Sequence, residues 1–341
     1  MTHVNRRSFL KASGTAGTIA LTGLSGCVGG IGGGGGTPTL SLGWVVPVEN
    51  FATLMSVPDL QEQVPNLGDA YEFESVHHSS TPEGVNALAS GETDMTLMTT
   101  VSFANAIAQE AVPDGITAFM TDFWDAHDDY YGISVFSGAD SDITEPADME
   151  GKKLGVNATG TGIHAVYVKA LTEVGLDPEN DVEFVELGFP AFTQAIKDGR
   201  FDVGVYPALF AVQARGEGFT KVYGSQDFFD PYPFAYNVAA NRTLDEKGDA
   251  VRAFSEDYVS LLDYARNNRG EVISAAASHF ELPEALLDAY FLTDNDYYRD
   301  EVAMDAEALN GVMSDLVDLG FIDQQRAYSE FVTTHYMPRP P

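Results

Sequence analysis

The side chains best suited to hold a small molecule lie directly after stretches that we expect to be buried β-strands. They are hydroxyl, amide, imidazole and aromatic groups, which offer hydrogen bonds and flat apolar surface rather than nucleophilic chemistry. These candidate ligand-binding residues are Trp44, Ser79, Ser80, Thr81, Thr99, Thr100, Asn157, Thr159, Thr161, Gly162, His164, Phe189 and Tyr206. Their types and positions predict a binding site for a small polar solute.

The turn from Asn157 to His164 leads into a helix that we expect to begin near Thr161. Free N–H groups and the positive end of the helix dipole would favour an anion there. Thr159 or Thr161 would equally serve as the N-cap, and His164 would either bond the solute or lie on the surface. No Lys or Arg occurs in the candidate turns, which argues against an anion, so the charge of the solute stays open.

An acidic and aromatic segment at Asp122–Asp125 is followed by Tyr130 and Tyr131. If Asp122, Trp124, Tyr130 and Tyr131 line the cleft, they would favour a neutral or cationic heterocycle. If they face solvent, they say nothing about the ligand, and the sequence leaves both alternatives open.

The sequence offers no recognisable catalytic machinery. No Gly-x-Ser-x-Gly elbow follows the N-terminal segment, and the only cysteine is Cys27. The neighbouring His77 and His78 would point to opposite faces of a strand, which makes them a poor metal pair. We therefore expect no catalytic residue, no metal and no cofactor.

Strands and helices are expected to alternate, which indicates parallel α/β layering. Strands are expected at 40–46, 71–76, 95–98, 117–123, 154–156, 182–187, 201–205 and 234–240. Helices are expected at 55–64, 82–90, 102–109, 161–174, 192–197, 244–267, 271–280, 283–290, 304–319 and 324–332. Ligands of parallel α/β proteins bind beyond the carboxyl ends of the strands, where the candidate residues lie.

One stretch of the chain echoes another. Ala87–Met95 and Ala195–Val203 align without a gap, and both are predicted to form a helix, a Gly stop and an Asp before an apolar strand. Duplication of one structural unit would produce this pattern, and we infer two similar lobes.

The N-terminus carries signals for export and lipidation. Arg6 and Arg7 precede an uncharged apolar stretch at 12–21 that is too short for the roughly 20 residues of a membrane span. The paired arginines resemble a twin-arginine export motif. Leu24-Ser25-Gly26-Cys27 resembles a lipobox, in which Cys27 receives the lipid. These signals predict a lipoprotein on the outer face of the cell membrane.

The chain is strongly acidic. It has 51 acidic against 18 basic residues and a net charge of −33, yet 44% of its residues are hydrophobic. This charge excludes nucleic acid as a partner, and the apolar content excludes an acidic disordered tail. We interpret it as the surface of a protein from a halophilic archaeon, and we expect a monomer without disulfides.

Motifs in both halves carry a family resemblance. They are Met149–Val156, Asn157–His164 and Gly175–Asp177, together with the two echo segments. From about Leu40 to Tyr336 the chain resembles the nitrate/sulfonate/taurine-type solute-binding proteins of ABC importers, a group that includes receptors for a thiamine-precursor pyrimidine.

The resemblance implies an α/β, two-lobed periplasmic-binding-protein-like fold of type II. Each lobe would be a mixed sheet flanked by helices, with a helical C-terminal part packed on lobe 1. The expected divisions are a signal peptide at 1–26, a lipid-anchored Gly-rich tether at 27–38, lobe 1 at 39–133, lobe 2 at 134–235, and the return to lobe 1 with the C-terminal helices at 236–341.

The resemblance also implies that the protein is not an enzyme. It would capture a small solute, nitrate/sulfonate/taurine-like or pyrimidine-like, by closure of the two lobes and deliver it to a membrane permease. An exported sensor or an exported enzyme is the alternative, and the sequence does not separate transport from sensing.

The lipobox makes a direct prediction. Replacing Cys27 with Ser should release the protein into the medium and leave its solute binding unchanged, because the acidic body has no charge attraction to an anionic membrane. Fractionation of cells expressing C27S checks this. If the variant stays with the membrane, the lipobox interpretation is wrong.

Overall fold

The computed structural model describes residues 36–323 and 326–338. The export residues Arg6 and Arg7, the lipidation residue Cys27, the predicted signal peptide and most of the predicted tether lie outside this range. None of the described helices is both long and apolar enough to cross a membrane.

The first sheet has five strands in the order β2-β1-β3-β10-β4. They are β1 (Thr39–Trp44), β2 (Glu72–His77), β3 (Met95–Thr99), β4 (Ile116–Asp125) and β10 (Tyr232–Ala240). β1 runs parallel to β2 and β3, whereas β10 is antiparallel to β3 and β4. All nine residues of β10 are buried, as expected for a strand that is paired on both edges and covered on both faces.

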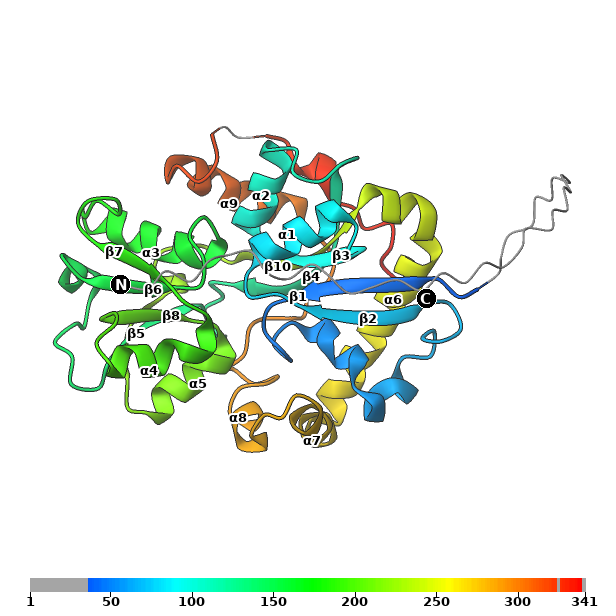
Figure 1. Ribbon diagram of the computed structural model, residues 1–341, viewed down its shortest axis with the longest axis horizontal. Helices are drawn as coiled ribbons and strands as arrows, with labels where there is room; N and C mark the ends of the chain where they lie inside the picture. The colour runs from blue at the N-terminus through cyan, green and yellow to red at the C-terminus, as the bar shows by residue number, and fades with distance from the viewer. Residues whose placement is uncertain (1–35, 324–325, 339–341) are drawn as a thin grey trace, which may run out of the picture. The chain divides into compact units, whose positions relative to one another are not determined.

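The second sheet repeats this plan in the order β7-β6-β8-β5-β9. Its strands are β5 (Ser134–Ser137), β6 (Lys153–Val156), β7 (Glu183–Glu186), β8 (Val203–Tyr206) and β9 (Thr220–Gly224), and β5 is the antiparallel one. In both sheets an antiparallel strand therefore lies fourth in the order. We call the parts of the chain built on the first and second sheets lobe 1 and lobe 2 (Figure 1).

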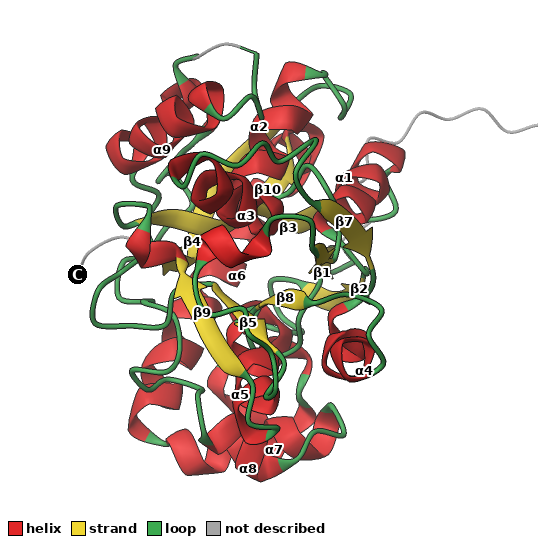
Figure 2. Cartoon of the chain, turned by 90° about the vertical axis from the view of Figure 1, so that its left-hand side faces the viewer, coloured by secondary structure: helices red, strands yellow, loops and turns green. Residues whose placement is uncertain are grey.

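Helices flank both sheets. Those of lobe 1 include α1 (Thr81–Ser90), α2 (Thr100–Ala108), α6 (Asn241–Asn267), α7 (Arg269–His279) and α9 (Ala306–Asp318), and those of lobe 2 are α3 (Gly162–Glu173), α4 (Phe192–Lys197) and α5 (Ala208–Gly216). Figure 2 shows helices against the strands of both lobes. The predicted α/β fold with two mixed sheets flanked by helices is confirmed.

The C-terminal helices mostly pack on lobe 1. α6 contacts β4 and β10, and α9 contacts α2 and β10, whereas the short α8 (Glu284–Asp288) contacts α5 of lobe 2. The C-terminal part therefore reaches both lobes.

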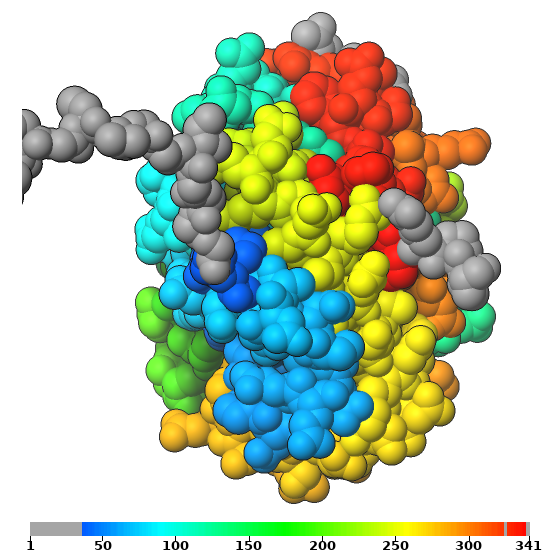
Figure 3. Space-filling model, turned by 90° about the vertical axis from the view of Figure 1, so that its right-hand side faces the viewer, coloured from blue at the N-terminus to red at the C-terminus, as the bar shows by residue number. Residues whose placement is uncertain are grey.

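Two expected helices were wrong. The helix expected at 55–64 is a pair of 3₁₀ turns, Phe51–Ser56 and Pro58–Gln63, because Pro58 cannot continue a preceding helix. In Figure 3 this blue segment lies beside the yellow α6, and the two are in contact. The helix expected at 324–332 is, among the described residues, only the 3₁₀ turn Tyr328–Phe331.

The two echo segments adopt matching structures. Gly91 and Gly199 both end a helix with positive φ, at 78° and 67°, which glycine adopts without strain. After each glycine an Asp accepts a hydrogen bond from the neighbouring parallel strand: Asp94 from Ser41 N at 3.0 Å, and Asp202 from Lys153 N at 2.8 Å. This equivalence supports the inference of two lobes built from one unit.

The chain passes from lobe 1 to lobe 2 between β4 and β5 and returns between β9 and β10. Asp125, at the end of β4, joins these two crossings. Its Oδ1 accepts from Ile133 N at 2.9 Å and from Ser225 Oγ at 2.7 Å. The exact lobe boundaries stay a prediction.

The paired aspartates should differ in their effect on stability. Asp94 also accepts from Ser41 Oγ at 3.1 Å and from Lys247 Nζ at 2.8 Å, whereas Asp202 is exposed. We expect Asp94→Ala to lower the free energy of unfolding by about 2–3 kcal/mol and Asp202→Ala by about 1 kcal/mol or less. Denaturant unfolding of both variants measures the difference. Equal losses would contradict the proposed role of the additional contacts.

Candidate functional site

The structure places a small cavity between the lobes, at the carboxyl ends of their parallel strands. We call it the inner pocket; its volume is about 40 Å³. Lobe 1 lines it with Val45, Val46, Glu49, Asn50, Thr81, Leu97, Thr99, Phe123, Phe234, Ala235 and Tyr297, and lobe 2 with Asn157, Thr161, Ile163, Phe189 and Pro207. Both lobes therefore supply its walls.

A larger hollow adjoins the inner pocket, and we call it the outer pocket. Its volume is about 400 Å³, and its lining residues are Trp44, Val45, Pro47, His77, Ser79, Gly188, Phe189, Pro190, Leu209, Phe210, Gln213 and Leu282. Val45 and Phe189 line both pockets. A solute extending from the inner pocket past these two residues would enter the outer one.

The predicted site residues fall into two groups. Thr81, Thr99, Asn157, Thr161 and Phe189 line the inner pocket, and Trp44 and Ser79 line the outer pocket. The structure brings these together although they are far apart in the chain. Contact with a ligand remains a prediction for all of them.

Some other predicted residues line neither pocket. Ser80 precedes α1 and is buried. Thr100 Oγ1 donates to the Pro233 carbonyl at 2.8 Å and so joins α2 to β10. Thr159 is exposed and donates to Glu186 Oε1 at 2.7 Å. The ring of Tyr206 is buried against Phe136 and Phe192.

His164 lies in a separate hollow. Its ring packs edge-on against Phe184 and Phe321, with centroid distances of 4.4 and 5.3 Å. Burial lowers the pKa of His164 to about 4, so the imidazole is neutral at pH 7. Its Nδ1 accepts from Gly160 N at 3.1 Å, which holds the turn before α3.

The lobes contact each other directly at the start of α3. Thr161 caps this helix by accepting from His164 N, and Gly162 N donates to Thr99 Oγ1 of lobe 1 at 3.1 Å. A Cβ on Gly162 would lie 2.8 Å from Phe234 Cε2 and 3.0 Å from Thr99 Cβ. A side chain at position 162 would therefore require Phe234 or Thr99 to shift.

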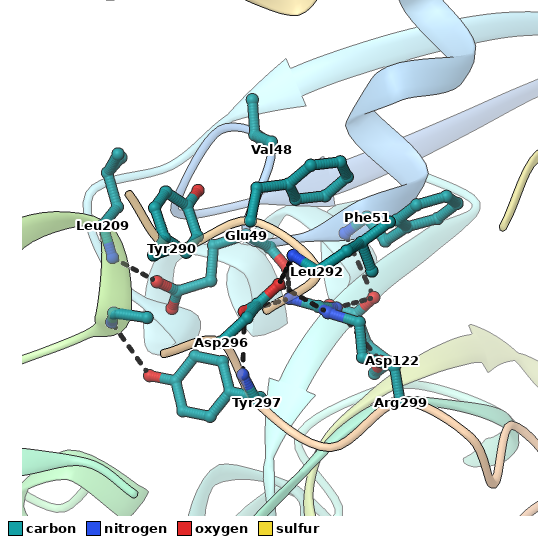
Figure 4. Close-up of polar contacts among 12 residues, drawn as sticks. Val48, Glu49, Phe51, Asp122, Leu209, Tyr290, Leu292, Asp296, Tyr297 and Arg299 are labelled. Atoms are coloured by element: carbon teal, nitrogen blue, oxygen red, sulfur yellow. Dashed lines mark hydrogen bonds and ion pairs between the residues drawn. The ribbon is translucent and has the colours of Figure 1, made fainter. Parts of the chain in front are cut away.

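A second contact between the lobes lies at the start of α5. Leu209 N of lobe 2 donates to Glu49 Oε2 at 3.2 Å, and Ala208 N donates to the Tyr297 hydroxyl at 3.3 Å (Figure 4). Both N–H groups belong to the first turn of the helix, where no intrahelical acceptor exists. Lobe 1 thus supplies the N-terminal cap of a lobe 2 helix.

A tight loop after β1 presents Glu49. Asn50 Oδ1 accepts from Val45 N at 2.9 Å and from Val46 N at 2.8 Å, and Thr53 Oγ1 accepts from Val48 N at 2.9 Å. Val48 has a φ of 66°, which is unusual for a β-branched residue and signals local strain. The strain accompanies the turn that directs Glu49 toward lobe 2.

A buried charge cluster holds this loop in place (Figure 4). Arg299 Nη2 donates to the Glu49 carbonyl at 2.7 Å and to Asp296 Oδ1 at 3.3 Å. Arg299 also lies 3.6 Å from Asp122 Oδ1, which accepts from Tyr258 Oη at 2.7 Å. The side chain of Arg299 is only 1% exposed, so its positive charge pairs with carboxyl groups inside the protein.

Burial dominates the electrostatics of the site. It raises the pKa of Glu49 to about 8; Asp296 and Asp122 raise this pKa further, while the Leu209 N–H and Arg299 oppose the shift. Burial also raises the pKa of Asp122, with Arg299 opposing. Glu49 is therefore largely protonated at pH 7 in this arrangement.

The acidic aromatic segment does not line the pockets, except for Phe123. Asp122 is buried in the charge cluster, and Trp124 Nε1 donates to the Glu301 carbonyl at 3.1 Å. Tyr131 is buried and donates to the Tyr206 carbonyl at 2.6 Å, and Tyr130 packs against His127 and Tyr298. Asp122, Trp124, Tyr130 and Tyr131 therefore line neither pocket, and the buried Asp122, Trp124 and Tyr131 do not face solvent either.

Sequence reasoning missed Glu49, Asn50 and Tyr297. Glu49 and Asn50 follow the first strand. Trp44 was selected because it lies at the end of that strand, and extending the same selection by five to six residues would have included Glu49 and Asn50. Tyr297 lies in an irregular segment after α8, and no local pattern marks it.

No Lys or Arg is among the residues that line the inner and outer pockets. Within residues 36–323 and 326–338, no group of three or more His, Cys, Asp or Glu is arranged to hold a metal. The site offers hydrogen bonds, one carboxyl group and aromatic walls.

Comparison with known sequences gives one family. The family described as "NMT1/THI5 like" matches residues 76–269, which is more than half of the chain. This match includes the turn before α3 and both echo segments. No curated protein sequence matches the chain.

Solved structures with the same fold include binding proteins and an enzyme. The chain is similar to the alkanesulfonate-binding protein SsuA from Xanthomonas axonopodis pv. citri, bound to MOPS (TM-score 0.69, 14% identity, 86% of this chain and 98% of that one). It is also similar to the periplasmic nitrate-binding protein NrtA from Synechocystis PCC 6803 (0.70, 12%, 88% and 87%). The desulfurization enzyme DSZB is similar too (0.62, 13%, 88% and 97%).

The close approach at Gly162 can be tested. Gly162→Ala should hold the lobes apart and increase the radius of gyration, because the added methyl group overlaps Phe234 and Thr99. Gly188→Ala is the matched control: its Cβ would meet nothing closer than Pro190 Cδ at 3.9 Å. Small-angle scattering of both variants measures the effect. Identical profiles for G162A and the unaltered protein would contradict the observed contact.

Proposed function

Because the chain belongs to the NMT1/THI5-like family, we propose that it is an extracytoplasmic solute-binding receptor of an ABC importer. The observation that carries this proposal is the inner pocket, whose walls come from both lobes. A solute placed there contacts lobe 1 and lobe 2 at once, so that its binding stabilises their closed arrangement.

The residues that line the pocket would make different kinds of contact with the solute. Thr81 and Thr99 of lobe 1 and Asn157 and Thr161 of lobe 2 offer hydrogen bonds across the pocket. Phe189 separates the inner pocket from the outer one. In this structure the two lobes bond each other directly, and an entering solute would replace part of those contacts with its own polar groups.

The crossings between the lobes would act as the hinge. They are the segments after β4 and after β9, which Asp125 ties together. Hinge closure in two-lobed proteins concentrates backbone changes in a few such connecting residues. We propose that the solute is nitrate/sulfonate/taurine-like or pyrimidine-like and passes to a membrane permease.

The proposal includes the export and lipidation signals at the N-terminus. Lipidation at Cys27 would keep the receptor at the outer face of the membrane, next to the permease. A sensor that passes a signal without releasing its solute would use the same binding step.

Binding is favoured over catalysis by the lining of the inner pocket. DSZB demonstrates that the fold also supports an enzyme. Yet no Cys, His, Lys or Ser is among the residues that line the inner pocket here. The Cys, Lys and Ser nucleophiles and the His base that such catalysis commonly uses are therefore missing from this pocket, which leaves Thr and Tyr hydroxyls and the carboxyl group of Glu49.

The proposal predicts a stabilising solute. In molar salt, at least one of nitrate, ethanesulfonate, taurine and cytosine, or a molecule found by mass spectrometry in the purified protein, should raise the melting temperature by several degrees. A ligand at 100 times its Kd adds about 2.7 kcal/mol. Small-angle scattering should change with the same solute. A folded protein that responds to none of these and carries no small molecule would contradict the proposed function.

A further inference from the structure

The inner pocket contains an acidic side chain but no basic one. Glu49 is its only acidic lining residue, and no Lys, Arg or His of the described chain lines it. Glu49 is 2% exposed, and among the described residues its carboxyl group accepts a hydrogen bond from only one N–H group, at the start of α5. A pocket built for nitrate or a sulfonate would instead present positive charge or unoccupied N–H donors.

The guanidinium and the first N–H groups of α5 near the pocket are already engaged. The guanidinium of Arg299 pairs with Asp122 and Asp296, and its side chain is 1% exposed. The first N–H groups of α5 bond Glu49 and Tyr297, and Gly162 N at the start of α3 bonds Thr99. An anion bound at these groups would have to displace these bonds, and it would lie beside a carboxyl group.

Lobe 2 contributes an unused acceptor to the pocket that Glu49 lines from lobe 1. Asn157 lines the inner pocket, and its Oδ1 is buried without a hydrogen-bond partner. A buried acceptor without a donor costs about 1–3 kcal/mol. A solute with N–H groups would satisfy Asn157 and Glu49 together, and each contact would join it to a different lobe.

The remaining walls suit a flat or positively charged group. Phe123 and Phe234 stack with a centroid distance of 5.7 Å, and Phe123 and Tyr297 with 4.0 Å, beside Phe189. Aromatic faces attract cations and pack against planar groups.

We propose that Glu49 determines specificity, selecting a solute whose head is a protonated amine or amidine and excluding small anions. This inference rests on the proposed function; among the solute classes named there it keeps those that carry an amine or amidine group and excludes nitrate and simple sulfonates. The N–H donors of the head contact Glu49 and Asn157 in the inner pocket. The less polar body of the solute extends past Val45 and Phe189 into the outer pocket.

Binding of a cation should release a proton. Groups facing Glu49 are Asp122 on β4, Tyr131 after β4, Tyr290, Asp296, Tyr297 and Arg299 in the segment after α8, and the N-terminus of α5. With a pKa of about 8, Glu49 is about nine-tenths protonated at pH 7. A bound cation favours the carboxylate, so its binding expels about one proton.

Calorimetry of the full chain tests the inference. Benzamidine and acetamidine are titrated at pH 7 in phosphate and in Tris, with benzoate, acetate, nitrate and ethanesulfonate as matched anions. We expect at least one amidine to bind. Its measured binding enthalpy should differ between the two buffers by the amount that the transfer of about one proton to the buffer produces. We expect the anions not to bind.

A matched pair of variants isolates Glu49. Glu49→Gln keeps an acceptor for Leu209 N but cannot become a carboxylate when a cation binds, so amidine affinity should fall at least tenfold and proton release should stop. Glu62→Gln makes the same substitution at an exposed position and should change neither the affinity nor the proton release. The proton release of the unaltered protein tests the inference even if E49Q is unstable.

The outcomes separate the two proposals. If an anion binds in preference to the amidines, or amidine binding releases no proton, the inference about Glu49 is overturned and the receptor function stands. If neither amidines nor anions bind and the solutes named above have no effect, both proposals fail.

Discussion

The site depends on one buried cation. Arg299 bonds the Glu49 carbonyl, lies against Asp122 on β4 and pairs with Asp296 in the segment after α8. These positions are far apart in the chain, and the guanidinium fixes all of them with its rigid set of donors. Removing one partner of such a buried cluster typically costs about 3–5 kcal/mol, because the remaining charges lose their compensation. Arg299 therefore links the loop that carries Glu49 to the segment that carries Tyr297.

The charge cluster of lobe 1 also determines which groups meet the helices of lobe 2. Glu49 and Tyr297 are held where they meet the first N–H groups of α5, and Thr99 meets the first N–H group of α3. Groups of lobe 1 thus occupy the positive ends of two lobe 2 helices. The inner pocket lies between these contacts. Its chemistry is therefore that of the groups left over, namely a carboxyl group, an amide oxygen, hydroxyls and aromatic rings.

The α/β alternation, the duplicated unit and part of the site could be predicted from the sequence. Local patterns are informative here: Gly91 and Gly199 end helices, and the turns at Thr81, Thr99 and Asn157 follow strands. The same rule also selected Thr100, Thr159 and Tyr206, because a strand end does not determine which way each side chain points. The helix expected at 55–64 is instead a pair of 3₁₀ turns, since such turns share most of the helical pattern. The roles of Glu49 and Tyr297 depend on their tertiary contacts with Arg299 and α5, which no local sequence pattern reveals.

The central claim is that one solute is held between the two lobes by groups from both. The most direct test is a crystal structure of the protein with the small molecule that co-purifies with it. The account predicts density in the inner pocket, with polar contacts from Glu49 or Thr99 of lobe 1 and from Asn157 or Thr161 of lobe 2. A solute bound to one lobe alone, or in a different hollow such as that beside His164, would contradict it.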